Sequence, residues 1–350
     1  MQPKKANGVR SAKNSHMTKK LSHKYIRKAL TITLALVTIL TTVTALTACS
    51  CGGTAETTSE TYVSQEGDFN DDDWGTTISY NGETYKKKSD IKTFLFLGLD
   101  AGDGTEAYEP AGTERADTIV LFVIDESTKD IQIVELSRNS MVDVDVYNKD
   151  REKLFTNTMQ ICLQYLYADS RARGNHLMKN KVSDVLLGVT IDDVLALQMD
   201  GIPVIVDYMG GIEITMEEDC TYIDASYTEG AKVTMDGAAA ERFVRNRDTK
   251  VTGSNENSRM ARQTWFMKQF FQIMKSKGGS FMAKAMDEAK DYIETDMSSD
   301  TISDILKGTM NDEVKVIPGE VSEGTYGDEY NLDQQGLKEM VIDLYYEKVS

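Results

Sequence analysis

Three apolar segments that lie close together, at 94–97, 118–125 and 131–137, constrain the fold of this chain most strongly. The first is a continuous apolar run, which is typical of a strand buried on both faces of a sheet. Only the short polar connection 126–130 separates the second segment from the third, so these two most simply form an antiparallel hairpin. We predict that the three strands organise the sheet of the folded body.

Charged side chains stand at the ends of these predicted strands. In chain order they are Asp100, Arg115, Asp117 and Arg138. The hairpin places the start of the second strand and the end of the third at one edge, which makes Asp117 and Arg138 neighbours. Asp100 joins them if the first strand pairs antiparallel to the second.

These residue types suit a metal-bound diphosphate. Mg²⁺ prefers a few carboxylates together with phosphate oxygens, and arginine offers phosphate a planar, bidentate fork. Salt bridges at strand ends explain the same residues equally well, so spacing alone leaves both interpretations open.

Two further groups of polar residues extend this set. Arg245 and Arg247 face the same way only in an extended segment, where they form either a phosphate clamp or, more simply, a solvated charge pair. Arg259 and Gln263 share one face in the first turns of a long predicted helix, with Arg262 beside them. Cations at a helix N-terminus oppose the helix dipole, which slightly favours an anion-binding role.

The rest of the body reads as helices alternating with strands, the pattern of a helix-covered sheet. Predicted helices span 156–166, 175–187, 202–209, 238–244, 258–277, 282–292, 299–307 and 333–349. Predicted strands span 194–199, 212–216 and 314–317, and a short hairpin joins 77–80 to 83–85. Tyr165, Tyr167, Trp265 and the Phe-rich helix at 258–277 form ordinary core or, less simply, line an apolar cleft.

The N-terminal region predicts an export signal. Residues 1–28 form a basic leader, and 29–51 form an apolar signal or anchor that contains the lipobox-like segment Leu46 to Cys49. A polar tether at 52–76 then leads to a body at 77–350. Lipidation at Cys49 and an uncleaved membrane helix both leave that body outside the cytoplasmic membrane, because the positive leader stays inside.

Charge excludes one class of partner. The first 51 residues hold nine Lys or Arg and no acid, which leaves 30 basic and 56 acidic residues in the remainder, a net charge of −26. A body this acidic lacks the basic surface that binding to nucleic acid requires. Cys162 and Cys220 lack metal-site spacing and are interpreted as two buried thiols rather than a disulfide.

Several segments in the correct order make the chain resemble the LytR-CpsA-Psr family. They are FLFLGLD (94–100), RADTIVLFVID (115–125), IQIVELSRNS (131–140), ALQMDGIPVIVDYMGGIEIT (196–215) and VRNRDTKVTGSNENSRMARQ (244–263). The resemblance implies a single extracytoplasmic α/β domain, an α/β/α sandwich around a central mixed sheet, with an apolar pocket for a polyprenyl chain. It also implies Mg²⁺-dependent transfer of a glycopolymer, such as teichoic acid or capsule, from undecaprenyl pyrophosphate to peptidoglycan.

The resemblance also assigns roles to residues by position. Asp100 and Asp117 match the family's metal-side aspartates, and Asp117 is expected to take the proton of the acceptor hydroxyl. The phosphate-binding positions are Arg115, Arg138, Arg245 and Arg247, and Gln263 matches a polar residue at the head group. Arg138 is expected to act with Asp117 in catalysis, by neutralising charge on the departing lipid phosphate.

Two departures from the family pattern keep a rival interpretation open. Ser137-Arg138-Asn139 stands where the family has Pro-Arg-Asp, so the arginine is kept and the acid is not. Lys153 is a weak match to the family's lysine before the next helix. The rival is a non-catalytic lipoprotein that binds polyprenyl pyrophosphate, or another extracellular ligand, as a scaffold or regulator.

Overall fold

A six-stranded mixed sheet forms the centre of the protein. The computed structural model describes residues 74–101, 112–246, 255–324 and 327–349. The strand order is β11-β8-β3-β4-β5-β12. The strands are β11 (Ile293–Thr295), β8 (Asp193–Gln198), β3 (Ile91–Ala101), β4 (Glu114–Asp125), β5 (Asp130–Glu135) and β12 (Thr309–Val316).

The three predicted strands lie at the centre of this order, as β3, β4 and β5. β4 runs antiparallel to both neighbours, whereas β8 is parallel to β3 and β12 is parallel to β5. The predicted hairpin is confirmed, and the first strand does pair antiparallel to the second, the condition under which Asp100 joins this edge.

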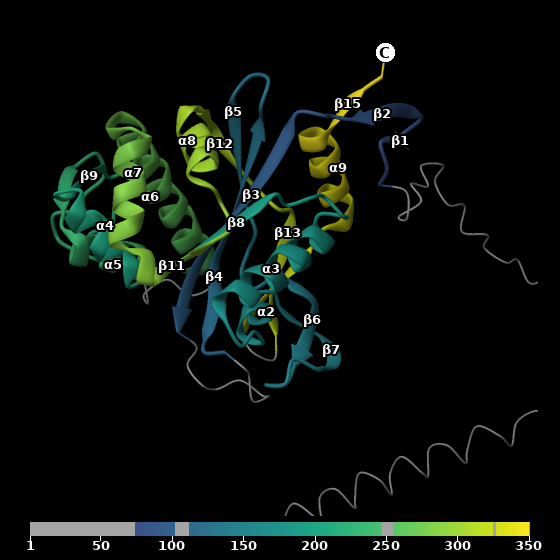
Figure 1. Cartoon of the computed structure of the whole chain (residues 1–350), viewed down its shortest axis with the longest axis horizontal. Coiled ribbons are helices and arrows are strands. Elements are labelled where there is room, and N and C mark those ends of the chain that lie inside the picture. The colour runs from purple at the N-terminus through teal and green to yellow at the C-terminus, as the bar shows by residue number, and fades with distance from the viewer. Residues whose placement is uncertain (1–73, 102–111, 247–254, 325–326, 350) are drawn as a thin grey trace, which may run out of the picture. The chain divides into compact units, whose positions relative to one another are not determined.

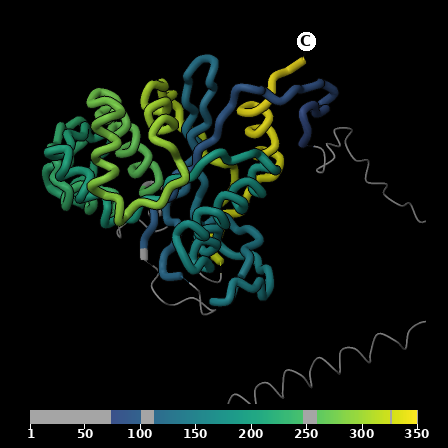
Figure 2. The backbone as a smooth tube through the Cα atoms, viewed as in Figure 1, coloured from purple at the N-terminus to yellow at the C-terminus, as the bar shows by residue number. Residues whose placement is uncertain are grey.

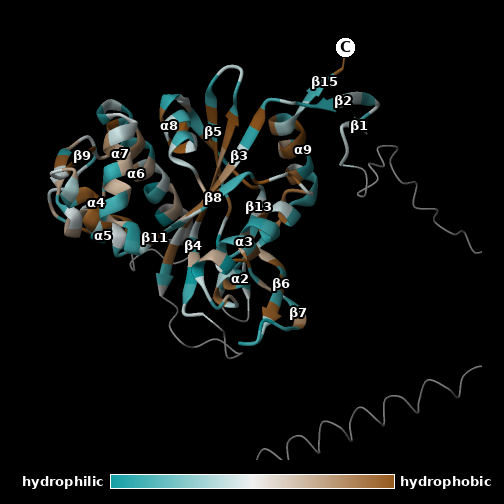
Figure 3. Cartoon of the chain, in the orientation of Figure 1, coloured by the Kyte–Doolittle hydropathy of each residue, from teal (hydrophilic) through white to brown (hydrophobic). Residues whose placement is uncertain are grey.

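Helices cover both faces of the sheet, which confirms the α/β/α sandwich (Figure 1). One face packs on α3 (Arg171–Val185) and α9 (Gln334–Tyr345) through a core that includes Leu121 and Val123 of β4. The other face packs on α4, α6, α7 and α8 through a core that includes Ile124. These helices are α4 (Gly201–Tyr208), α6 (Asn255–Lys277), α7 (Gly279–Glu288) and α8 (Ser299–Lys307). Burial on both faces explains why the strands are almost continuously apolar (Figure 3).

Smaller elements surround the sandwich. A third core joins α4 and α6 to α5 (Gly237–Arg245), β9 (Ile212–Thr215) and β10 (Lys232–Met235). β6 (Met141–Tyr147) and β7 (Lys153–Gln160) form a ribbon that leads into the short helix α2 (Leu163–Leu166). β13 (Gly319–Gly324) pairs with β14 (Gly327–Leu332), and η1 (Lys290–Tyr292) precedes β11. The chain's last strand, β15 (Tyr346–Lys348), pairs with the N-terminal hairpin of β1 (Thr77–Tyr80) and β2 (Glu83–Lys87), as the trace in Figure 2 shows.

Three sequence predictions need correction. The expected helix 156–166 is largely β7, because alternating threonines bond across the ribbon to β6, Thr156 to Asp145 at 2.7 Å and Thr158 to Asp143 at 2.9 Å. The expected strand 212–216 is β9, which pairs with β10 and stays outside the central sheet. The closing helix 333–349 ends at Tyr345, where the chain becomes extended and adds β15 to β2.

The expected leader, anchor and most of the tether lie outside the described residues. Within the parts of the chain that the structure does describe, no helix has the length and apolar character needed to cross a bilayer. The two cysteines in these parts, Cys162 and Cys220, are buried and are not joined by a disulfide, as predicted.

Candidate functional site

A β-bulge at Asp117 shapes the site. Gly98 pairs with Thr118 and the next residue, Leu99, pairs with Ala116, so Asp117 is the extra residue of β4. Successive side chains of a regular strand point to opposite faces, and a bulge changes that direction. Asp117 and Thr118 therefore both reach α6, one turn apart, where Asp117 meets Arg259 and Thr118 meets Gln263.

Asp117 and Arg138 form a buried ion pair, as the hairpin geometry predicts. Nη1 of Arg138 lies 2.5 Å from Oδ2 of Asp117, and Nη1 of Arg259 lies 3.9 Å from the same oxygen. Arg259 also donates from Nη2 to the Asp117 carbonyl at 3.5 Å. Asp117 is 3% exposed and Arg138 is 9% exposed. Burial raises the pKa of Asp117, and the guanidinium groups of Arg138, Arg259 and Arg115 oppose that shift.

Oδ1, the second carboxylate oxygen of Asp117, is buried and accepts no hydrogen bond from any residue in the described ranges. Those ranges contain no group of three or more His, Cys, Asp or Glu that could hold a metal ion. A metal at this edge would therefore rely on one or two aspartates and on oxygens of a bound phosphate, which suits Mg²⁺.

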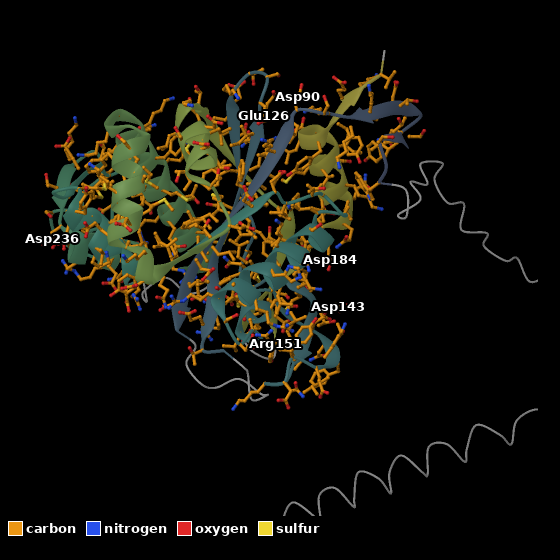
Figure 4. All side chains as sticks on the ribbon, viewed as in Figure 1. Asp90, Glu126, Asp143, Arg151, Asp184 and Asp236 are labelled. Carbon is orange, nitrogen blue, oxygen red and sulfur yellow. The ribbon has the colours of Figure 1, made fainter. Side chains whose placement is uncertain are left out.

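Asp100 lies opposite Arg115 at the end of the β3–β4 pair and contacts Arg245 from α5. Nη1 of Arg245 donates to Oδ1 of Asp100 at 3.2 Å, and its Nη2 approaches Glu241 at 3.1 Å and Asp200 at 3.6 Å. This edge thus collects Asp100, Arg115 and Arg245 beside the buried pair. The opposite end of β3 and β4 carries Asp90 and Glu126 (Figure 4).

One premise about Arg245 is wrong. Arg245 is the last residue of α5 rather than part of an extended segment, because Asp236 caps that helix by accepting from the Ala239 amide at 2.8 Å and the helix runs on through Arg245. Arg247 lies outside the described residues. The contact between Arg245 and Asp100 therefore depends on how α5 is placed against the sheet.

An apolar cavity of about 200 Å³ adjoins this charged edge. It lies between the β3–β4–β8 face of the sheet and helices α4, α6, α7 and α8, and it is lined by residues such as Phe266, Phe270 and Met274. Thr118 and Gln263 form part of its polar wall, where the Thr118 hydroxyl donates to Oε1 of Gln263 at 2.9 Å. The cavity thus adjoins Asp117 through the next residue of β4.

Close packing at this wall requires a glycine at position 98. A Cβ at Gly98 would lie 2.9 Å from the side chain of Thr118 and would displace it. Tyr165, Tyr167 and Trp265 are core residues and are not part of the cavity lining. The Phe-rich helix does line the cavity, through Phe266, Phe270 and Phe271.

Lys153 stands apart from the charged edge. Its Nζ pairs with Asp145 at 2.7 Å, near the end of the β6–β7 ribbon marked in Figure 4 by Arg151. The end of the ribbon near Arg138 is Gln160, seven residues away along β7, or roughly 20 Å. Asn139 has a structural contact, since its carbonyl accepts from the Tyr330 amide at 2.9 Å.

Arg259, for which the sequence slightly favours an anion-binding role at the start of a helix, lies at Asp117 in this site. Glu135 was missed altogether. It is 5% exposed, it faces α6 near Thr264, and its Oε1 accepts no hydrogen bond from any described residue.

Glu135 gives the stability of the protein a testable pH dependence. Burial raises the pKa of Glu135 above its ordinary value of 4.5, against a smaller opposing effect of the Thr264 hydroxyl. The native state therefore holds this proton more tightly than the unfolded state. The resulting stabilisation is present below pH 4.5 and is lost as the pH rises through the native pKa.

We expect Glu135→Gln to remove this loss. Between the pKa of Glu135 in the unfolded state and its higher pKa in the native state, the wild type loses free energy of unfolding as the pH rises. The variant does not, so the difference between them should change by up to about 1.4 kcal/mol per pH unit, in favour of the variant. Denaturant unfolding from pH 4 to pH 8 measures the difference, with the exposed Glu288→Gln as a control. Parallel curves for wild type and Glu135→Gln would contradict the prediction.

The fold and the sequence place the chain among known proteins. A model of the LytR_cpsA_psr family matches residues 53–344. The chain is 24% identical to the polyisoprenyl-teichoic acid–peptidoglycan teichoic acid transferase TagU of Enterococcus faecalis (strain ATCC 700802 / V583) over 212 residues, 60% of this chain and 63% of that protein.

Solved structures agree on the fold. The crystal structure of B. subtilis TagU superposes with a TM-score of 0.53 at 17% identity, covering 73% of this chain and 95% of that one. A structure of TagT bound to LI-WTA gives the same TM-score and identity over 73% of this chain and 90% of that one. Because the family model spans most of the sequence, this chain belongs to the LytR-CpsA-Psr family.

Proposed function

We propose that this protein transfers a glycopolymer from undecaprenyl pyrophosphate to a hydroxyl of peptidoglycan, outside the cytoplasmic membrane. The observation that carries the proposal is the charged edge of Asp100, Asp117, Arg138 and Arg245 beside an apolar cavity. A ligand that matches both has a polyanionic head and a hydrocarbon tail, which describes a polyprenyl pyrophosphate. The teichoic acid transferase TagU and the TagT bound to LI-WTA support this substrate class.

We propose that Mg²⁺ binds at Asp100 and Asp117. The Oδ1 atom of Asp117, which no described residue hydrogen-bonds, fits this role. When bound, the ion would neutralise diphosphate charge that the acidic body would otherwise repel.

The arginines supply the remaining positive charge. Arg138 and Arg259 approach Asp117 from β5 and α6, and Arg115 and Arg245 stand at Asp100. In the proposed reaction the acceptor oxygen attacks the phosphorus that carries the polymer, and the bond to the lipid phosphate breaks. Fixed guanidinium groups favour this step because they stabilise the charge that develops on the departing lipid phosphate.

Asp117 is the proposed proton acceptor. Its carboxylate, paired with Arg138, stands at the edge where the diphosphate and the attacking hydroxyl would meet. The acceptor hydroxyl loses that proton as its oxygen attacks phosphorus. Anchoring through lipidated Cys49 or an uncleaved helix, as the sequence predicts, would keep the site close to the lipid substrate.

Release of undecaprenyl phosphate tests the proposal. The full chain, purified in detergent with Mg²⁺, lipid-linked polymer and peptidoglycan, should release it, and chelation by EDTA should lower the rate at least about 100-fold. Restored Mg²⁺ should restore the rate. Binding of the lipid without release under all conditions would support the non-catalytic scaffold instead.

A further inference from the structure

A buried arginine outside the predicted phosphate set holds the end of α5. Arg262 is 1% exposed and is one of the largest fully buried side chains of the described residues. Its Nε donates to the Phe243 carbonyl at 2.8 Å, its Nη2 donates to the Asn246 carbonyl, and its Nη1 donates to the Tyr222 hydroxyl. One planar side chain thus bonds three acceptors on two segments.

Gln263 adds a third bond to the same helix end. Its Nε2 donates to the Val244 carbonyl at 3.1 Å. The last carbonyls of a helix lack partners within the helix and carry its partial negative charge. Arg262 and Gln263 satisfy these carbonyls from α6 and fix where α5 ends. That end carries Arg245, which reaches Asp100.

Stability of the core does not require an arginine at position 262. Within the described part of the chain no carboxylate forms an ion pair with Arg262, and burial lowers its pKa. The rings of Tyr222 and Phe243, 5.7 and 5.8 Å from its guanidinium carbon, offset only part of the desolvation cost. An apolar side chain would fill this core, but it would not bond the α5 carbonyls.

We propose that Arg262 is a positioning residue, which acts through the end of α5 to aim Arg245 at the diphosphate of the lipid substrate. The proposal rests on the proposed function, because it assumes a diphosphate ligand. Arginine is needed for its geometry as well as its charge, since a lysine ammonium cannot bond three separated acceptors in one plane. Arg262→Lys should therefore fail to replace it.

The affinities for a polyprenyl pyrophosphate and for the matching polyprenol test this proposal. The alcohol has the same tail and lacks the phosphates, so it reports on the cavity alone. We expect Arg262→Lys and Arg262→Met to weaken pyrophosphate binding about 10- to 100-fold, the range for lost hydrogen bonds of a charged group. Polyprenol binding by the full chain should change less than about threefold, since the cavity wall is untouched.

Two further variants separate positioning from general destabilisation. Ile214→Ala removes a fully buried side chain of the same core but touches none of the four bonds, so it should lower stability and leave the affinity ratio of the two lipids unchanged. Tyr222→Phe removes one acceptor and keeps the ring. It should lower the ratio in the same direction as the Arg262 variants, and it decides the matter if those variants do not fold.

Three outcomes would overturn the inference. The first is that Arg262→Lys, or Tyr222→Phe if only that variant folds, keeps the wild-type ratio of pyrophosphate affinity to polyprenol affinity. The second is that the variants bind both lipids equally more weakly, which would show that Arg262 has only a structural role. The third is that the wild-type protein binds the two lipids equally well, which would contradict the proposed function as well as this inference.

Discussion

Replacing Asp117 by alanine is expected to lower transfer activity about 10²- to 10⁴-fold and to destabilise the protein by roughly 3–5 kcal/mol. The activity falls because the proposed proton acceptor and metal ligand is lost. Stability falls because Arg138, only 9% exposed, loses the buried carboxylate 2.5 Å from its Nη1.

Asp117→Asn separates these two effects. The amide keeps the size of the side chain but neither accepts the proton nor balances the charge of Arg138. Transfer assays and denaturant unfolding of both variants should show loss of activity in each. Asp287→Ala, an exposed aspartate 3.8 Å from Lys290, should change neither quantity appreciably. Activity of Asp117→Asn within threefold of the wild type would rule out Asp117 as the proton acceptor.

The second large effect is expected from filling the cavity. Met267 lines the cavity from α6 and belongs to none of the packed cores, so Met267→Trp adds volume inside the cavity at little cost to those cores. Each buried CH₂ contributes about 0.8 kcal/mol, and exclusion of even part of the lipid tail should weaken long-chain binding more than about 100-fold.

Chain length provides the internal control for this prediction. A short prenyl pyrophosphate, which places few carbons in the cavity, should bind Met267→Trp about as well as it binds the wild type. Met340→Trp, a matched change on α9 at the opposite face of the sheet, should affect neither lipid. Equal losses for short and long chains would show that the cavity does not hold the tail.

The sequence predicts the paired edge of the site because that edge depends on local order. A short connection between two apolar runs forces a hairpin, and the hairpin alone brings Asp117 to Arg138. The bulge that turns Asp117 toward α6 depends on the register between β3 and β4, which no local pattern encodes. The same limit applies to Arg262, whose partners follow from how α6 packs against α5.

In the ribbon of β6 and β7, by contrast, a local pattern was present but predicted the wrong element. Met159, Leu163 and Leu166 follow helical spacing, yet Met159 lies in a strand and the other two in one short helical turn. Pairing with β6 prevails because Thr156 and Thr158 gain partners across the ribbon. Tertiary pairing of this kind overrides periodicity in short segments.

Transfer of a labelled phosphate tests the central claim most directly. The lipid-linked polymer would carry ³²P either at the phosphate next to the sugar or at the phosphate next to the lipid. With the full chain, Mg²⁺ and peptidoglycan, the sugar-side label should appear in peptidoglycan and the lipid-side label should remain on undecaprenyl phosphate. Absence of sugar-side label from peptidoglycan, or its appearance there at the same rate with Asp117→Asn, would contradict the account.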